Sequence, residues 1–412
     1  MKKLLIFSIL LLSCISTRAQ KFDDCFEDRT LRLDYIFAGD VNQQQIYIDE
    51  LVSLPHWYGR RERLSEVPLT GNGQIIVKAK DSGNVIYHHS FSSLFQEWLA
   101  TDEAKHVQKS FENVFLIPYP KTPVEITIEI YDYHGKIVSS MRHTVDPNDI
   151  LIRKAGEKTE AVTPFETLQQ AADTNHCIHI AYVAEGYTAD EMEHFLDDCK
   201  KASESLFRHE PFKAMQDRFN IVAVKSVSEE SGTSEPSKGI WKNTALASHF
   251  DTFYSDRYLT TLHLKRLHDI LAGTPYEHII ILVNTDHYGG GGIYNSYNLC
   301  YTGGKHFLPV VVHEFGHSFG GLGDEYAYGN DDPMYFADTE PWEPNLTTKA
   351  HFVGKWEDLV KEGKADLIEG GGYLTNGVWR GFENCRMRTN EEPEFCLVCQ
   401  QALTRLIKFY TE

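Results

Sequence analysis

The chain has no excess of positive charge. Its 412 residues carry 40 Lys and Arg against 59 Asp and Glu, which gives a formal net charge of −19 at pH 7. Nucleic-acid binding depends on clustered Lys and Arg that neutralise phosphates, and anionic membrane surfaces also attract positive charge. The charge balance therefore argues against both partners and favours an ordinary acidic, solvated surface.

Long hydrophobic runs are also lacking after the first residues. The chain opens with the basic "MKK", the apolar "LLIFSILLLSCI" and then "STRAQ". This order is typical of a secretory signal peptide, and an apolar run of about 12 residues is too short to span a bilayer. We expect a signal peptide over residues 1–19 and an exported mature chain (periplasmic, cell-surface or secreted) without a transmembrane segment. Lipid attachment at Cys14 is the alternative.

Cysteine is scarce, and its count is odd once Cys14 is removed. The remaining cysteines are Cys25, Cys177, Cys199, Cys300, Cys385, Cys396 and Cys399. An exported chain can hold disulfides, but an odd count leaves at least one thiol without a partner in the chain. For the last three we expect a disulfide that includes Cys385. A structural zinc is the alternative, although a fourth ligand is not evident.

Internal repeats and low-complexity tracts are absent, and residues 20–152 have the pattern of β-strands. In "PVEITIEIYDYHGKIVSSMRHTV", apolar residues from Val124 to Ile130 alternate with polar ones before a turn at His134-Gly135, which predicts a hairpin. "QIIVKAKDSGNVIYHHSF" predicts two further strands. One apolar face per strand is typical of an antiparallel β-sandwich, which we predict over residues 20–152. The polar stretch that follows predicts a linker over 153–176.

Residues 177–412 alternate predicted strands with predicted helices. "IHIAYVAEGY", "FNIVAVKSV" and "HIIILVN" are apolar enough for buried strands. Helices are predicted over 188–207, where Thr188 and Glu191 have the spacing of a capping box, and over 256–273. Such alternation indicates an α/β domain, so the whole chain is predicted to be a two-domain protein of the α+β or α/β class.

The segment "HFLPVVVHEFGHSFGG" (306–321) predicts a buried helix with a metal site. His313 and His317 are four residues apart and share one face, so both can bind one zinc ion. Glu314 can then act as general acid/base for a zinc-bound water, whose pKa zinc lowers from 15.7 to about 7. A buried helix with two His and a Glu is costly without a metal or partners, which argues against a chance match.

A catalytic zinc takes three protein ligands and keeps one position open. In the metzincin pattern H-E-x-x-H-x-x-G-x-x-H a glycine ends the helix, and a third His follows. Gly320 matches that glycine, whereas Gly323 occupies the third-His position and cannot bind a metal. We therefore predict the next residue, Asp324, as the third ligand. The alternatives are Glu325, Glu340 and Glu343.

Three further features have roles that the sequence leaves open. Met387 in "ENCRMRTN" is placed like the methionine turn beneath a metzincin metal. "YGGGGIYNSYNLCYTGG" (288–304) is either a rim strand that pairs with a substrate peptide or a loop without contact. Tyr326, Tyr373 and Arg388 are candidates to stabilise an oxyanion, and the sequence does not rank them.

The motifs "HEFGHSFGGLGDEY", "AEGYT", "SEESGTSEP" and "CRMR…FCLVC" resemble the IgA-specific metalloendopeptidase family, a secreted, metzincin-like group. The resemblance covers roughly residues 160–412, and the β-rich region is similar to the N-terminal domain of many members. It implies that His313 and His317 bind zinc, that Glu314 is the catalytic acid/base, and that Asp324 is the third ligand. The immunoglobulin substrate of one member is not carried over.

These patterns together predict an exported zinc endopeptidase that acts on protein or peptide substrates. One alternative is a zinc hydrolase of a non-peptide amide, such as a glycan N-acyl group. The other is a non-catalytic surface-binding module, but such a module has no need of Glu314. The sequence carries no signal for the oligomeric state.

Overall fold

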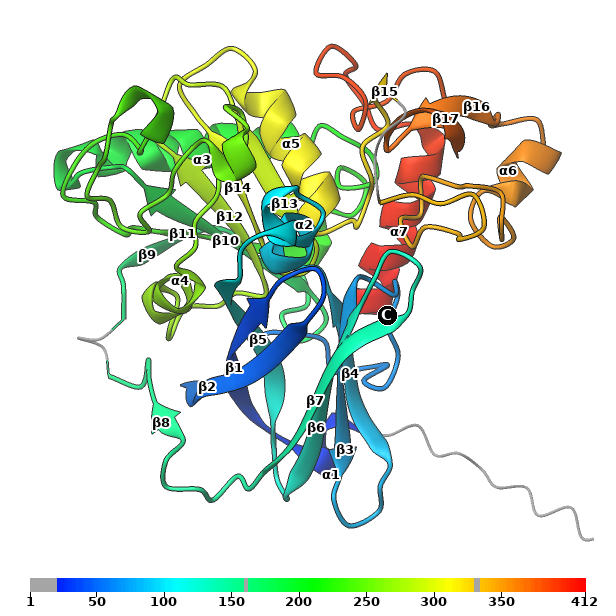
Figure 1. Cartoon of the computed structure of the whole chain (residues 1–412). Helices are drawn as coiled ribbons and strands as arrows, with labels where there is room; N and C mark the ends of the chain where they lie inside the picture. The colour runs from blue at the N-terminus through cyan, green and yellow to red at the C-terminus, as the bar shows by residue number, and fades with distance from the viewer. Residues whose placement is uncertain (1–20, 159–161, 330–333) are drawn as a thin grey trace, which may run out of the picture.

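The computed structural model describes residues 21–158, 162–329 and 334–412. The predicted signal peptide and Cys14 lie outside these residues. Two β-containing units pack against each other, an N-terminal unit drawn in blue and cyan and a larger unit drawn in green to red (Figure 1). No helix in the described ranges is long and apolar enough to cross a membrane.

The N-terminal unit contains two four-stranded sheets, with strand orders β5-β1-β2-β8 and β4-β3-β6-β7. The strands are β1 (Phe26–Gly39), β2 (Gln44–Pro55), β3 (Gly73–Ala79), β4 (Val85–Phe91), β5 (Lys109–Pro120), β6 (Val124–Tyr131), β7 (Ile137–Val145) and β8 (Arg153–Lys154). All pairs in these sheets are antiparallel except β2 with the short β8. Two short helices accompany them, α1 (Phe22–Cys25) and α2 (Leu94–Leu99).

The apolar alternation of the sequence produces the core between these two sheets. Val124, Ile126, Ile128 and Ile130 are fully buried on β6. Phe91 of β4 lies 4.4 Å from Phe115 of β5, measured between ring centroids, so the sheets pack face to face. The predicted hairpins are confirmed, because β3 pairs antiparallel with β4 and β6 with β7. The N-terminal domain is thus β-rich, as the sequence predicts.

The larger unit is built on a six-stranded sheet with the order β13-β14-β12-β10-β11-β9. Its strands are β9 (Phe165–Gln169), β10 (Ile178–Glu185), β11 (Phe219–Val224), β12 (His278–Val283), β13 (Gly290–Ile293) and β14 (Tyr297–Tyr301). The four inner strands are parallel, and both edge strands are antiparallel to their neighbours. A sheet with parallel inner strands needs cover on both faces.

Both faces of this sheet are covered. Ala181 and Val183 of β10 belong to the same apolar cluster as the core of the N-terminal sheets. Ile180 and Tyr182, on the other face, pack in a cluster with residues of α3, α5 and α7. The helices are α3 (Met192–Leu206), α4 (Leu264–Ile270), α5 (Phe307–Ser318), α6 (Glu357–Lys361) and α7 (Leu397–Thr411).

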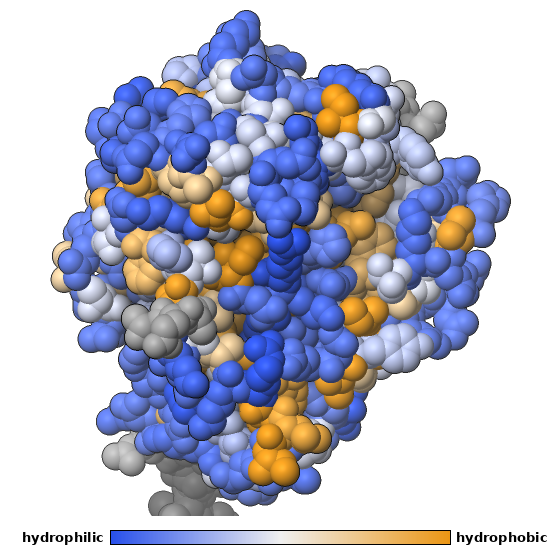
Figure 2. Space-filling model, turned by 90° about the vertical axis from the view of Figure 1, so that its left-hand side faces the viewer, coloured by the Kyte–Doolittle hydropathy of each residue, from blue (hydrophilic) through white to orange (hydrophobic). Residues whose placement is uncertain are grey.

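Short elements complete the two units. A three-stranded sheet contains β15 (Ala327–Gly329), β16 (Ile368–Gly371) and β17 (Tyr373–Arg380). Short 3-10 helices cover Glu103–Lys105, Ala189–Glu191, Gln216–Arg218, Pro236–Lys238 and Thr252–Tyr254. The surface face in Figure 2 is mainly hydrophilic with separate apolar patches, as the composition predicts.

Of the helices predicted over 188–207 and 256–273, the first is present and the second is only partly present. The helix expected over 188–207 is present as a 3-10 turn followed by α3, with the capping box of Thr188 and Glu191. The helix expected over 256–273 is wrong in its first half, because only α4 is helical. Leu259 N instead donates to Gly290 O, so pairing with a distant strand overrides the local preference.

Residues 153–176, where the sequence predicts a linker, contain strand β8 at their start and strand β9 at 165–169. β8 pairs with β2 of the N-terminal unit, and β9 pairs with β11 at the edge of the six-stranded sheet.

Candidate metal centre

α5 carries two histidines on one face, and the turn after it leads back toward them. Its buried apolar residues, among them Val311 and Phe315, pack in the core, while His313 and His317 remain partly exposed. Gly321 ends the helix in the left-handed region, with φ of 58°, and its N–H donates to His317 O. The reversal brings Asp324 to the histidines.

Three donor atoms converge at this point. His313 Nε2 and His317 Nε2 are 3.0 Å apart, and Asp324 Oδ1 lies 3.1 Å from the first and 3.3 Å from the second. Tetrahedral zinc with ligands at about 2.0–2.1 Å separates neighbouring ligand atoms by about 3.3 Å. The spacing of the three donors therefore fits a tetrahedral metal ion with one open position.

The hydrogen bond at Nδ1 of each histidine fixes the tautomer, and therefore fixes Nε2 as the nitrogen with a free lone pair toward the site. His313 Nδ1 lies 3.0 Å from Arg386 O, and His317 Nδ1 lies 2.6 Å from Leu322 O. A carbonyl only accepts, so each Nδ1 must carry the hydrogen. The lone pairs of both Nε2 atoms in the neutral rings then face each other and the Asp324 carboxylate. Such an arrangement is repulsive unless a proton or a metal cation lies among the three atoms, so the site favours bound positive charge.

The pKa values of His317 and Asp324 in the metal-free site also show that the site favours positive charge. Burial lowers the pKa of His317, but the adjacent Asp324 carboxylate more than offsets burial and raises this pKa to about 9. Burial opposes ionisation of Asp324, yet His317 and His313 hold the pKa of Asp324 well below its ordinary range. The carboxylate is therefore ionised and ready to bind a cation.

Tyr373 holds the other oxygen of Asp324. Its hydroxyl donates to Asp324 Oδ2 at 2.5 Å. Tyr373 has φ of 67°, a conformation that costs a non-glycine residue about 1–2 kcal/mol. Backbone bonds from Gly372 N to Asp324 O and from Tyr373 N to Tyr326 O keep it there. Strain held in this way at a polar cluster is typical of a functional site.

Glu314 lies beside the donor atoms with its carboxylate uncommitted. Across the described ranges, no hydrogen bond or ion pair engages this carboxylate, and burial raises its pKa. The space beside it exists because residue 290 on β13 is glycine: a Cβ at Gly290 would lie 2.6 Å from Glu314 Oε1. Glu314 can thus accept a proton at the edge of the site.

Met387 lies directly against α5. It is fully buried, and a Cβ at Gly316, between the two histidines, would lie 2.6 Å from its Sδ. The neighbouring Arg386 O accepts from His313, and Met387 O accepts from Glu325 N. The segment around Met387 therefore supports both the helix and the acidic turn.

The other acids suggested by the sequence do not join the histidines. The donor group, whose atoms lie within 4.8 Å of one another, contains His313, His317 and Asp324. Glu325 faces a different cluster, since its Oε1 accepts from Asn345 Nδ2 at 2.9 Å. Glu340 forms an ion pair with Lys355 at 2.9 Å. Glu343 lies near Tyr335, 3.3 Å from its hydroxyl.

The disulfide expected at Cys385 is wrong. Cys385, Cys396 and Cys399 are all free, and Cys385 Sγ lies 3.6 Å from Cys399 Sγ. A disulfide needs about 2.05 Å between the sulfur atoms. The sulfurs instead gather around the Glu325 carboxylate.

The structure places two of the three candidate oxyanion stabilisers and the glycine-rich segment. Arg388 forms an ion pair with Glu383 at 2.8 Å, whereas Tyr373 is at the site. The glycine-rich segment forms edge strand β13 instead of an unpaired loop. Its Gly290 N and O are already bonded to residues 257–259, so a substrate strand cannot pair at that residue.

Sequence reasoning missed Glu97, which approaches the site from the N-terminal unit on α2. Tyr258 OH donates to its carboxylate. Burial raises the pKa of Glu97 to about 7, and the charges of His317 and Glu314 also influence it. No spacing pattern in the sequence marks Glu97, because only the packing of the two units brings it close.

Comparison with known families matches both units. A family model described as IgA Peptidase M64 matches residues 167–366, and one described as Peptidase M64 N-terminus matches residues 21–142. No curated protein matches the chain. The first match contains α5 and Asp324, and it ends before Met387.

Proposed function

The chain belongs to the IgA peptidase M64 family, a metallopeptidase family, and is a hydrolase acting on peptide bonds; we propose that it is an exported, zinc-dependent endopeptidase. His313, His317 and Asp324 would hold the zinc, and Glu314 would serve as general acid/base. The proposal places the signal peptide at 1–19, the N-terminal domain at 20–152, the linker at 153–176 and a metzincin-like catalytic domain at 177–412.

One observation carries this proposal: two Nε2 lone pairs and one carboxylate oxygen face one another at 3.0–3.3 Å. Imidazole and carboxylate are ligands that zinc accepts in catalytic sites. When bound, zinc supplies Lewis acidity toward a carbonyl and lowers the pKa of water to about 7. Partial exposure of both histidines leaves access for a substrate.

The residues of the chain have distinct tasks in this account. The Glu314 carboxylate takes a proton from the attacking water and delivers it to the leaving amine. Arg386 O and Leu322 O hold the two imidazoles in one tautomer. Tyr373 would orient Asp324, and Met387, which packs against α5 at Gly316, would take the place of the methionine under a metzincin metal.

Metal-dependent cleavage of a peptide library tests the proposal. The full mature chain is stripped with a chelator and restored with zinc, and the products are mapped by mass spectrometry. We expect internal peptide cuts that disappear on stripping and return with zinc. Release of N-acyl groups from glycans without peptide cuts would favour the non-peptide amidase, and turnover of neither substrate would favour a binding module.

A further inference from the structure

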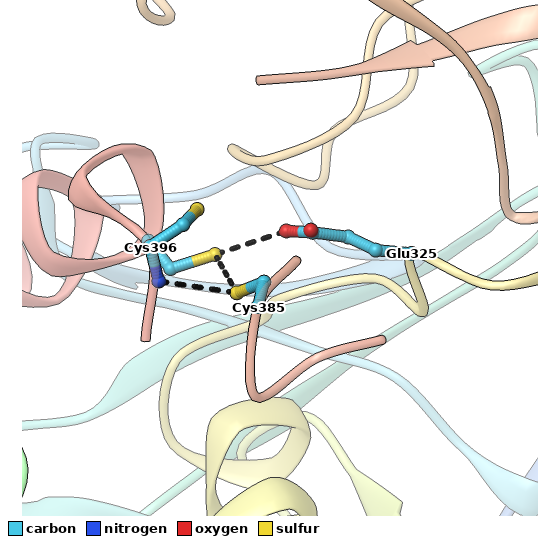
Figure 3. A group of neighbouring side chains, drawn as sticks. Glu325, Cys385 and Cys396 are labelled. Atoms are coloured by element: carbon cyan, nitrogen blue, oxygen red, sulfur yellow. Dashed lines mark hydrogen bonds between the residues drawn. The ribbon is translucent and has the colours of Figure 1, made fainter. Parts of the chain in front are cut away.

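A second group of donor atoms lies on the other side of the turn that carries Asp324. It consists of Glu325, Cys385, Cys396 and Cys399, which are all buried, and its ligand atoms lie within 4.8 Å of one another. Figure 3 shows the Glu325 carboxylate pointing toward Cys385 and Cys396, which come from the C-terminal part of the chain. We call these four residues the Cys3Glu cluster.

Direct contacts join the members of the Cys3Glu cluster. Cys399 Sγ lies 3.2 Å from Glu325 Oε1 and 3.6 Å from Cys385 Sγ. Cys396 N donates to Cys385 Sγ at 3.2 Å. Three sulfurs and one carboxylate therefore converge from the turn after α5, the Met387 segment and the start of α7.

The carboxylate in this cluster lacks the partners that its burial demands. Glu325 is fully buried, and its Oε2 has no hydrogen-bond partner among the described residues. Asn345 and Cys399 engage only Oε1. No Lys, Arg or His of the described chain forms an ion pair with it. Burial of an uncompensated carboxylate is costly, and a bound cation would remove that cost.

We propose that Glu325, Cys385, Cys396 and Cys399 bind a second zinc ion, which is structural and distinct from the zinc of the peptidase site. Cys396 and Cys399 have the C-x2-C spacing of zinc ligands. Cys396 is the N-cap of α7, where the helix end favours a thiolate. Thiolate ligands select zinc over hard cations, and four buried protein ligands close the site, which is typical of a structural role.

Zinc binding here is an acid–base step without redox change. The thiol protons leave to solvent as the Zn–S bonds form, and the Glu325 carboxylate supplies the fourth bond. Oxidation of the same cysteines to a disulfide would compete with zinc, so the two states exclude each other.

This metal would position the catalytic centre. Glu325 N donates to Met387 O at 2.9 Å, so the cluster holds the acidic turn to the Met387 segment. Asp324, one residue earlier, faces the opposite way toward His313. A metal on the Glu325 side would thus fix the direction of Asp324. The second site stands on its own residues and does not depend on the peptidase proposal.

Zinc content and zinc-edge X-ray absorption test the second site. We expect two zinc ions per wild-type chain and one in His313→Ala/His317→Ala, whose remaining zinc shows sulfur neighbours at about 2.3 Å. Cys399→Ser should also reduce the content to one. Cys177→Ser is the matched control, since Cys177 is a buried free cysteine outside the cluster, and should retain two.

The double-histidine variant decides the matter even if Cys399→Ser does not fold, because it leaves all four proposed ligands intact. A folded double-histidine variant without zinc, or with zinc that lacks sulfur neighbours, would overturn the proposal. A disulfide among Cys385, Cys396 and Cys399 in the protein purified without reductant would also overturn it. Sulfur-bound zinc in a wild-type chain that cleaves no peptide would count against the peptidase proposal alone.

Discussion

Asp324 and Glu325 are consecutive, yet their carboxylates face different groups. Asp324 Oδ1 lies 3.1 Å from His313 Nε2, whereas Glu325 Oε1 lies 3.2 Å from Cys399 Sγ. Neighbouring residues in extended backbone point to opposite sides, so one turn can serve both groups. The two acids are not interchangeable in this arrangement.

Replacement of the proposed base should remove turnover and leave the site otherwise intact. We expect Glu314→Gln to lower kcat/KM for peptide cleavage by about 10²–10⁴-fold, the usual contribution of a general acid/base. Zinc content and melting temperature should match the wild type, because Glu314 is not among the grouped donors. Wild-type cleavage rates in this variant would remove Glu314 from the mechanism.

A methyl group at residue 290 should displace that base. A Cβ at Gly290 would lie 2.6 Å from Glu314 Oε1, so Gly290→Ala should reduce kcat by about 10-fold or more with unchanged zinc content. Gly329→Ala is the control, since a Cβ at Gly329 meets no described atom within 4 Å. Equal kcat for both variants would show that Glu314 tolerates the displacement.

Removal of one hydroxyl should weaken the first metal site. Tyr373 OH is bonded to Asp324 Oδ2 at 2.5 Å, and loss of such a partner typically costs 10–100-fold in metal affinity or activity. We expect Tyr373→Phe to lose zinc affinity in competition with a chelator and to recover kcat at high zinc. Tyr328→Phe, at a largely exposed tyrosine, is the control. Unchanged affinity with reduced kcat would instead give Tyr373 a role at the substrate.

Glu277 should make the stability of the protein pH-dependent. Burial raises the pKa of Glu277 to about 8, more than Arg60 lowers it. Because this folded-state pKa is above the unfolded value of about 4.3, its stabilising contribution is complete below pH 4.3 and is lost as pH rises through 8.

Glu277→Gln should therefore raise the free energy of unfolding above pH 8 by a few kcal/mol, since one pKa unit corresponds to about 1.4 kcal/mol. The difference from wild type should shrink toward pH 5. Urea unfolding at both pH values measures it, with the exposed Glu193→Gln as control. A gain of equal size at both pH values would exclude titration of Glu277 as the cause.

The sequence predicted those elements whose formation depends on residue spacing within a short segment. The two hairpins, the capping box at Thr188 and the helix with His313 and His317 follow from spacing within short segments. Asp324 could be singled out because the reversal after Gly320 leaves few residues that can return to the helix. Its role as a ligand remains a prediction.

Long-range packing explains what the sequence did not show. The segment 256–263 is not helical because Leu259 pairs with Gly290 on a distant strand. Glu97 approaches the site only because the two units pack together. The fourth member of the Cys3Glu cluster was not evident from the sequence because Glu325 is far from the cysteines along the chain. The strands β15, β16 and β17 lie between Glu325 and Cys385.

An anomalous-scattering map at the zinc edge, from crystals of the zinc-loaded wild-type chain, tests the assignment of Asp324 most directly. We predict a zinc peak bounded by His313 Nε2, His317 Nε2 and an Asp324 carboxylate oxygen within about 2.2 Å, with Glu325 facing Cys399. A Glu325 oxygen at that distance with Asp324 turned away, or no zinc between the histidines, would contradict the account.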